Sequence, residues 1–279
     1  MTRPIMAQSL AWACAPMLLI GCSSNSPGAK PQTSSAPNPA PASAITAAAT
    51  PLSSASLSVQ VSRNLVYREA DGKTSMVIQR DPPPDCVCAG RTWQVRRFDI
   101  DADASDAAAI LQATPSMRPT REQTFLIVPG NSIAMVSEIN REEDVEVVFD
   151  PPLVVMPDGL PGTNINSAEF TQTLRMSVHP IGNRKAVKRA GPVKNTIRYL
   201  GDERITTPAG TFTARRVESS FEADLAPARV VNTSIQHFAD GVGLVKEDER
   251  ESTSALGVPI RKNADQWLLF WFDPAAPAR

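Results

Sequence analysis

An alternation of apolar and polar residues in the segment AEFTQTLRMSVHP, residues 168–180, limits the fold more than any other feature of the sequence. In an extended strand, Phe170, Leu174, Met176 and Val178 fall on one face, interrupted only by Gln172, and polar side chains fall on the other. Such a strand is buried on one side only, so its sheet must curl or be covered. We expect the apolar face to line a groove that takes up a ligand.

Eleven other segments also have the pattern of strands, and Pro, Gly, Asn and Asp residues mark turns between several of them. They span 58–68, 74–79, 92–100, 124–128, 132–139, 144–149, 196–200, 211–219, 229–238, 244–250 and 266–272. One helix is expected over DAAAILQA, with Ser105 as its N-cap and Pro115 after its end. These expectations give a mainly β fold, a curled antiparallel meander or half-open β-barrel with at most one or two short helices.

The segment QWLLFWF at 266–272 differs from the other strands because both of its faces are apolar. Such a pattern is typical of a strand that is buried on both sides. We therefore expect either a central strand that closes the sheet or a strand that is covered by a partner.

The first 21 residues have the pattern of an export signal. Arg3 precedes an apolar stretch, 7–20, that is too short and too interrupted for a membrane-spanning helix. The sequence LIGC at 19–22 resembles a bacterial lipobox, which implies acylation of the Cys22 thiol. The alternative is an ordinary signal peptide that happens to contain Cys22. By resemblance to the sorting rule of enteric lipoproteins, Ser23 implies the outer membrane, with the body facing the periplasm.

Residues 22–56 join this cysteine to the rest of the chain. The 34 residues after Cys22 contain nine Ser, nine Ala and six Pro, and Lys30 is their only charge, so they cannot bury a core and are expected to be a disordered tether. A single β-rich periplasmic domain follows over 57–272, and 273–279 form a flexible tail. The net charge of −1 gives no electrostatic reason to expect a nucleic-acid partner.

Three segments of the C-terminal half carry a family resemblance: VVFDPPLVVMP at 147–157, ITTPAGTFTARRVE at 205–218 and HFADGVGLVKEDE at 237–249. Over about 145–252 they resemble a group of Gram-negative periplasmic domains and lipoproteins of unassigned function. In architecture these are similar to the half-open barrels of lipoprotein-sorting proteins. From the residues themselves, the PAGTF and GVGLV motifs indicate turns between strands.

Cys86 and Cys88 are the pair of cysteines within the expected domain. In an oxidising compartment they would bond to each other in a small ring of modest stabilising effect. A redox or soft-metal site and free or intermolecular thiols are the alternatives. The acidic segment DIDADASD at 99–106 lacks the Gly and Glu that a calcium loop needs, so no metal site is expected there.

We find no catalytic constellation, because His179 and His237 lie in expected strands without a recognisable nucleophile or metal motif. The basic run RKAVKR at 184–189 is expected to be a solvated loop. No catalytic residue, metal or cofactor is therefore predicted. The sequence favours a non-enzymatic envelope lipoprotein, held on the membrane by its lipid, that binds a lipid or hydrophobic segment. The alternative is a scaffold subunit of an envelope assembly with a protein partner.

Overall fold

The computed structural model describes residues 64–69, 75–81, 91–114, 116–129, 132–158, 169–240 and 242–272. The export signal, Cys22, the tether, Cys86, Cys88 and the C-terminal tail lie outside these residues, so the expectations about them stay predictions. No helix in the described part of the chain is long and apolar enough to cross a membrane.

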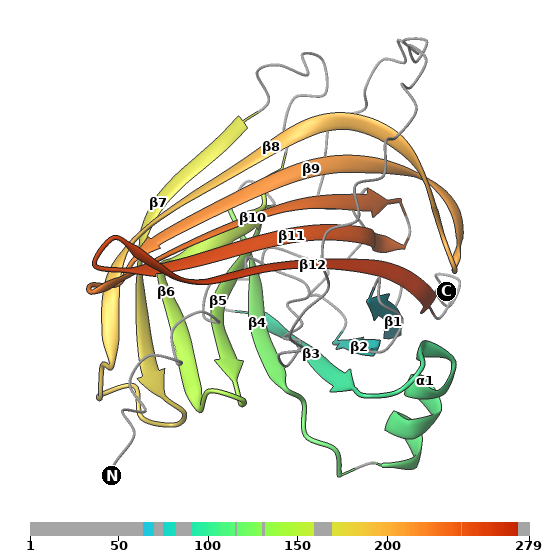
Figure 1. Cartoon of the computed structure of the whole chain (residues 1–279), viewed down its shortest axis with the longest axis horizontal. Coiled ribbons are helices and arrows are strands. Elements are labelled where there is room, and N and C mark those ends of the chain that lie inside the picture. Colours follow the sequence, from blue (N-terminus) through green and yellow to red (C-terminus); the bar gives the residue numbers. More distant parts are fainter. Residues whose placement is uncertain are drawn as a thin grey trace.

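The described residues form twelve strands and one helix (Figure 1). In chain order they are β1 (Asn64–Glu69), β2 (Ser75–Arg80), β3 (Thr92–Ile100), α1 (Ala104–Ala113), β4 (Arg121–Val128), β5 (Ser132–Asn140), β6 (Val145–Met156), β7 (Glu169–Pro180), β8 (Arg189–Thr207), β9 (Gly210–Asp224), β10 (Ala228–Ala239), β11 (Gly243–Ala255) and β12 (Val258–Phe272). The prediction of a mainly β chain with few helices is confirmed.

Each strand pairs antiparallel with the next in sequence, and β12 pairs with β1, so the sheet is a closed barrel. This closure goes further than the half-open barrel expected from the sequence. The pairing of β1 with β12 runs from Leu65 opposite Phe272 to Glu69 opposite Trp267. The doubly apolar segment 266–272 is therefore the closing strand, as one of its two interpretations predicted.

Helix α1 covers part of the outer surface of the barrel beside β1, β2 and β3 (Figure 1). Its Ala104 and Ala107 pack in a small apolar cluster with Phe98 of β3. The helix is capped by the side chain of Asp103, which accepts a hydrogen bond from the Ser105 backbone N–H at 3.0 Å. The prediction that Ser105 is the cap was wrong, because the helix begins at Ala104, two residues before the expected start at Asp106.

The two family-like motifs form turns, as predicted. The PAGTF motif connects β8 to β9, and Gly210 there has a φ of +139°, which an L side chain rarely adopts. The GVGLV motif connects β10 to β11, where Gly243 has a φ of +101°.

Candidate functional site

One side of the barrel interior is apolar and is called here the apolar wall. It consists of inward-facing residues of β6 to β9: Val145, Val147, Phe149, Phe170, Leu174, Met176, Val178, Val193, Ile197, Val217 and Phe221. Of the four predicted groove residues, Leu174, Met176 and Val178 are buried, and Phe170 is half-buried and packs against the same cluster. The structure thus brings all four together on one inner face, and their contact with a ligand stays a prediction.

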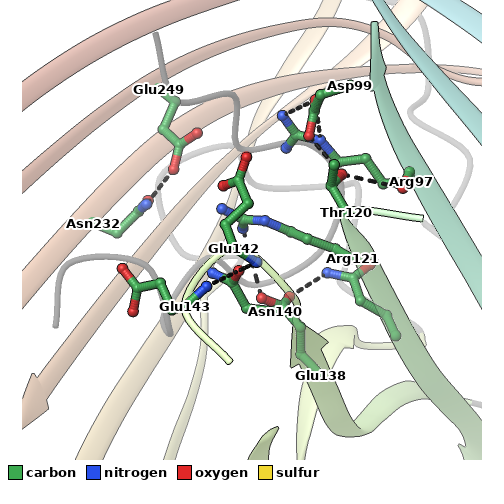
Figure 2. Close-up of polar contacts among 11 residues, drawn as sticks. Arg97, Asp99, Thr120, Arg121, Glu138, Asn140, Glu142, Glu143, Asn232 and Glu249 are labelled. Carbon is green, nitrogen blue, oxygen red and sulfur yellow. Dashed lines mark hydrogen bonds and ion pairs between the residues drawn. The ribbon is translucent and has the colours of Figure 1, made fainter. Parts of the chain in front are cut away.

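The inward-facing side of β3 to β5 and β10 to β12 carries polar and ionisable side chains, called here the charged wall, beside further members of the same apolar cluster, such as Trp93, Phe125 and Trp267. The charged wall consists of Arg97, Asp99, Arg121, Glu138, Asn232, Ser234, Gln236, Glu247, Glu249, Glu251, Thr253, Arg261 and Asp265, from β3 to β5 and β10 to β12. Six of these are acids and three are arginines. Figure 2 shows several of them projecting from separate strands toward a common space.

A row of three glutamates on β11 forms the centre of the charged wall. Because side chains alternate along a strand, Glu247, Glu249 and Glu251 all point to the same side, and they are only 3%, 4% and 6% exposed. In the strand register, Glu247 lies opposite Trp267 and Glu249 lies opposite Asp265 of β12. The row is therefore inside the barrel, with a second carboxyl group directly beside Glu249.

Amide side chains of β10 hold one oxygen of each of two glutamates. Gln236 Nε2 donates to Glu247 Oε1 at 2.8 Å, and Asn232 Nδ2 donates to Glu249 Oε1. The other oxygen, Oε2, of both glutamates has no hydrogen-bond partner among the described residues.

Two arginines of the charged wall, Arg97 on β3 and Arg121 on β4, face the acids of the wall. Arg121 lies 3.6 Å from Glu138, and both side chains are almost fully buried. Gln123 Nε2 donates to the other oxygen of Glu138 at 2.7 Å. Arg97 is paired with Asp99 and lies over the ring of Trp267, with its Cζ 5.6 Å from the ring centroid. This part of the wall balances its own charges (Figure 2).

Burial raises the pKa values of the β11 glutamates, since a carboxylate loses its hydration in the interior. It raises the pKa of Glu249 to about 8 and that of Glu251 to about 7, and neighbouring carboxyl groups add to both increases. The pKa of Glu247 is raised well above the ordinary value for the same two reasons. Around neutral pH, a substantial part of this row is therefore protonated.

A cavity of about 340 Å³ opens beside the charged wall. The cavity lies at the end of β1, next to Glu69. Beyond this residue, the edge of β12 that pairs with β1 has no further partner among the described strands. Its lining consists of Glu69, Asp248, Glu249, Arg250, Ala264, Asp265 and Gln266. Residues from both faces of β11 and β12 thus line the cavity, among them Glu249 and Asp265 of the charged wall.

The other predicted candidates lie elsewhere. His179 Nδ1 is 3.2 Å from the Ala186 carbonyl, which can only accept, so its Nε2 accepts from Ser177 Oγ at 2.8 Å. His237 contacts Glu203 at 3.2 Å, and burial lowers its pKa. Among the described residues, no group of three His, Cys, Asp or Glu converges as a metal site would require.

The charged wall was missed by the sequence interpretation. In KEDEREST, acids and polar residues fall on both faces, so nothing marks which face is buried. On β10, Asn232, Ser234 and Gln236 face inward while Ile235 lies half-buried on the outside, which reverses the usual assignment. The sequence did contain one signal for the charged wall. Three glutamates occupy every second position of β11, and β10 beside it carries amide side chains.

The family model described as DUF3108-like matches residues 121–256, from the start of β4 to just past the end of β11. This region includes the predicted 145–252 and most of both walls. No curated protein matches the chain.

Two solved structures show weak similarity to the chain. A candidate lipoprotein from Parabacteroides distasonis has 12% identity and a TM-score of 0.41, covering 77% of this chain and 95% of that one. A candidate exported protein with a YmcC-like fold from Bacteroides fragilis has 13% identity and a TM-score of 0.39, covering 77% and 94%. These TM-scores are too low to assign a shared fold, so the fold of the chain is defined by its own strand order. Over residues 121–256 the chain is similar to the DUF3108-like family.

Proposed function

We propose that the protein is a non-enzymatic lipoprotein of the bacterial cell envelope that holds an amphiphile inside its barrel. The observation that carries this proposal is the division of the interior into an apolar wall and a charged wall. The hydrocarbon part of an amphiphile would contact the first wall, and its polar part would contact the second. The sequence analysis expected a lipid or hydrophobic segment as the ligand. The proposal adds that this ligand carries a polar group.

The size of the barrel supports an internal ligand. Barrels of about eight strands have interiors that side chains just fill or that hold one small ligand, and barrels of about 16 enclose a channel. The twelve strands here lie between these cases. The cavity of about 340 Å³ beside the charged wall is within the range of roughly 300–1,000 Å³ that small-molecule sites occupy, although none of its lining residues belongs to the apolar wall.

We place the protein on the outer membrane, with its body in the periplasm, on the sequence features of residues 1–56. Acyl chains on Cys22 would anchor it, and the tether would let the barrel reach away from the surface. Replacement of Cys22 by Ser is expected to abolish lipid labelling of the chain. Labelling that persists in this variant would contradict the anchor.

Binding is proposed in place of catalysis because of how the polar groups are arranged. Ser177 and His179 form the described pair that most resembles a catalytic one, but a backbone carbonyl orients the imidazole. A carboxylate in that place would stabilise the imidazolium that forms during catalysis. The carboxyl groups of the charged wall lie in the interior, away from this pair.

Native mass spectrometry of the gently purified full chain tests the proposal. We expect a bound species with the mass of an amphiphile, at reduced occupancy in Phe170→Ala, because Phe170 is the half-buried member of the apolar wall. Thr171→Ala is the matched control, since Thr171 is exposed on the other face of β7. A chain that is uniformly free of ligand and binds no added amphiphile would contradict the proposal.

A further inference from the structure

We propose that the polar group of the ligand is a singly charged oxyanion such as a carboxylate, held inside the barrel by the guanidinium of Arg80 and the indole N–H of Trp93. This inference rests on the proposed function and names the chemical class of the ligand. Its evidence is a buried cation that lacks an acid, a second buried donor within reach of that cation, and the apolar surroundings of both.

Arg80 is a cation that the barrel buries without an acid. It lies at the end of β2, beside β3, and is 7% exposed. Within the described part of the chain its guanidinium forms no ion pair and no hydrogen bond, and the titratable group that interacts with its charge is the phenol of Tyr67 on β1. Burial raises the pKa of this phenol, so Tyr67 stays neutral and supplies no counter-charge. Arginine keeps its charge in proteins, and a buried charge without a partner is strongly unfavourable.

The side chain of Arg80 lies in the interior and reaches toward the turn between β10 and β11. Arg80 occupies the same face of β2 as Met76 and Ile78, which belong to the apolar cluster of the interior. A side-chain carbon placed on Gly243 would lie 3.3 Å from Arg80 Nη1. The glycine therefore leaves that side of the guanidinium without a covering side chain.

A second buried donor lies within reach of Arg80. In the register of β2 and β3, Arg80 is opposite Val95, and Trp93 is the next residue of β3 on the same face. Diagonal neighbours of this kind are about 7–8 Å apart, a distance that long and aromatic side chains span. The indole Nε1 of Trp93 is buried and has no hydrogen-bond partner among the described residues. Buried polar groups normally have partners, so two neighbouring donors without acceptors indicate a site that another molecule completes.

The two polar groups select an anion as the occupant. A guanidinium and an indole N–H can only donate hydrogen bonds, so the ligand must present acceptors. A carboxylate fits the planar fork of a guanidinium with two oxygen atoms, and its charge offsets that of Arg80. Apolar residues of the interior surround both donors, and a low dielectric strengthens the attraction between opposite charges.

The acids of the charged wall do not supply the missing charge. Arg97 is paired with Asp99, and Arg121 lies beside Glu138, so these two carboxyl groups already face a cation. Burial raises the pKa values of the β11 glutamates, so a substantial part of that row is neutral near pH 7. An anion at Arg80 would therefore gain a cation and meet little like charge.

The test is calorimetric titration of the full-length chain at pH 7 with three probes of equal chain length: decanoate, decanol and decylamine, each below its aggregation limit. We expect decanoate to bind at least about tenfold more tightly than either other probe, the effect of one charge-assisted hydrogen bond. This comparison uses the wild-type chain, so it stands whether or not a variant folds.

Three variants locate the site. Arg80→Met keeps an unbranched side chain and removes the charge, so it should cancel the preference for decanoate without lowering the melting temperature of the ligand-free chain. Arg80→Lys keeps the charge and should retain part of the preference. Trp93→Phe keeps the stacking on Phe125 but removes the N–H, so it should weaken decanoate several-fold and leave decanol unchanged.

Arg96→Met is the matched control. Arg96 lies on the neighbouring strand opposite Gln79, and it pairs with Asp81 at 3.1 Å, where both side chains are partly exposed. Because Arg96 is on the other face of β3 from Trp93, its replacement should leave the preference for decanoate as in the wild type.

Three results would count against this site. Equal binding of decanoate and decanol, unchanged by Arg80→Met, would remove the anion site and leave the proposed amphiphile carrier in place. A melting temperature that falls in Arg80→Met as far as for a lost core residue would assign Arg80 a structural role instead. Failure of every probe to bind, with no ligand in the purified chain, would contradict both proposals.

Discussion

The two walls of the barrel interior are built from strands of the same kind but carry opposite chemistry. On β7, Leu174 and Met176 meet a packed apolar cluster, whereas on β11, Glu247 and Glu249 occupy the equivalent inward positions. Apolar burial stabilises a fold by about 25 cal/mol per Å², while burial of a carboxyl group opposes it. The apolar wall thus accounts for stability, and the charged wall needs another explanation.

A buried ionic network is weak evidence for stability, since replacing it with apolar residues is often neutral or favourable. Perturbed carboxyl groups beside a cavity are typical of functional sites. Under the proposed function, the acids are present for binding. Four substitutions test this contrast, from the largest expected effect to the smallest.

Leu174→Asp should have the largest effect. It places an unpaired charge in the apolar wall, where Leu174 is 5% exposed, and the cost should be more than about 4 kcal/mol, a large share of the roughly 5–15 kcal/mol by which domains are stable. Thermal melts should show a greatly lowered melting temperature, or no cooperative transition, for this variant. Thr173→Asp is the control and should melt like the wild type, because Thr173 is exposed on the other face of β7. Equal melting of both variants would mean that the apolar wall is open to water.

Arg121→Ala should destabilise the charged wall by about 3–5 kcal/mol, because it leaves Glu138 buried without its cation. Urea unfolding would measure this change. Replacing both members, in Arg121→Met with Glu138→Met, should recover most of the loss if the pair contributes no net stability. A double variant as unstable as Arg121→Ala would instead assign the pair a structural role.

Glu249→Gln should change the pH dependence of stability. Since the folded chain binds this proton more tightly than the unfolded chain, the free energy of unfolding should fall as the pH rises from about 5 to 8, by about 3–4 kcal/mol for this carboxyl group. Well below pH 4 the group is protonated in both states, so it adds no pH dependence there. Melting temperatures across this range should fall less steeply in Glu249→Gln. An identical slope in variant and wild type would contradict the burial of this carboxyl group.

Arg229→Ala should have the smallest effect, less than about 1 kcal/mol. Arg229 pairs with Glu222 at 2.7 Å, but both side chains are largely exposed, so water replaces the lost partner. Compared with Arg121→Ala in the same urea assay, it separates an ion pair outside the barrel from one inside. A loss as large as that of Arg121→Ala would remove the distinction.

The sequence predicted the strands well and the charged wall not at all. Alternation located β7 because its inner residues are apolar and its outer residues polar, and the doubly apolar 266–272 gave the closing strand. Several strands were predicted too short, among them β8, which extends over Arg189–Thr207, and β11, which continues to Ala255. In these two strands, polar residues occupy inward positions, such as Asn195 and Glu251, so hydrophobicity no longer reports the buried face.

Closure of the barrel also could not be predicted from local pattern. The pairing of β1 with β12 joins the two ends of the described chain, and its register depends on long-range contacts. The charged wall depends on this closure, because Arg97 of β3 reaches Trp267 of β12 only in a closed sheet. The site is therefore a consequence of the topology.

The most direct test of the two-wall account is the titration of the glutamate carboxyl groups by carbon-detected NMR of the full chain labelled with ¹³C-glutamate. The account predicts a carboxyl resonance, absent from Glu249→Gln, that titrates near pH 8. A Glu249 resonance that titrates near pH 4.5 would show a solvated carboxylate and contradict a buried charged wall.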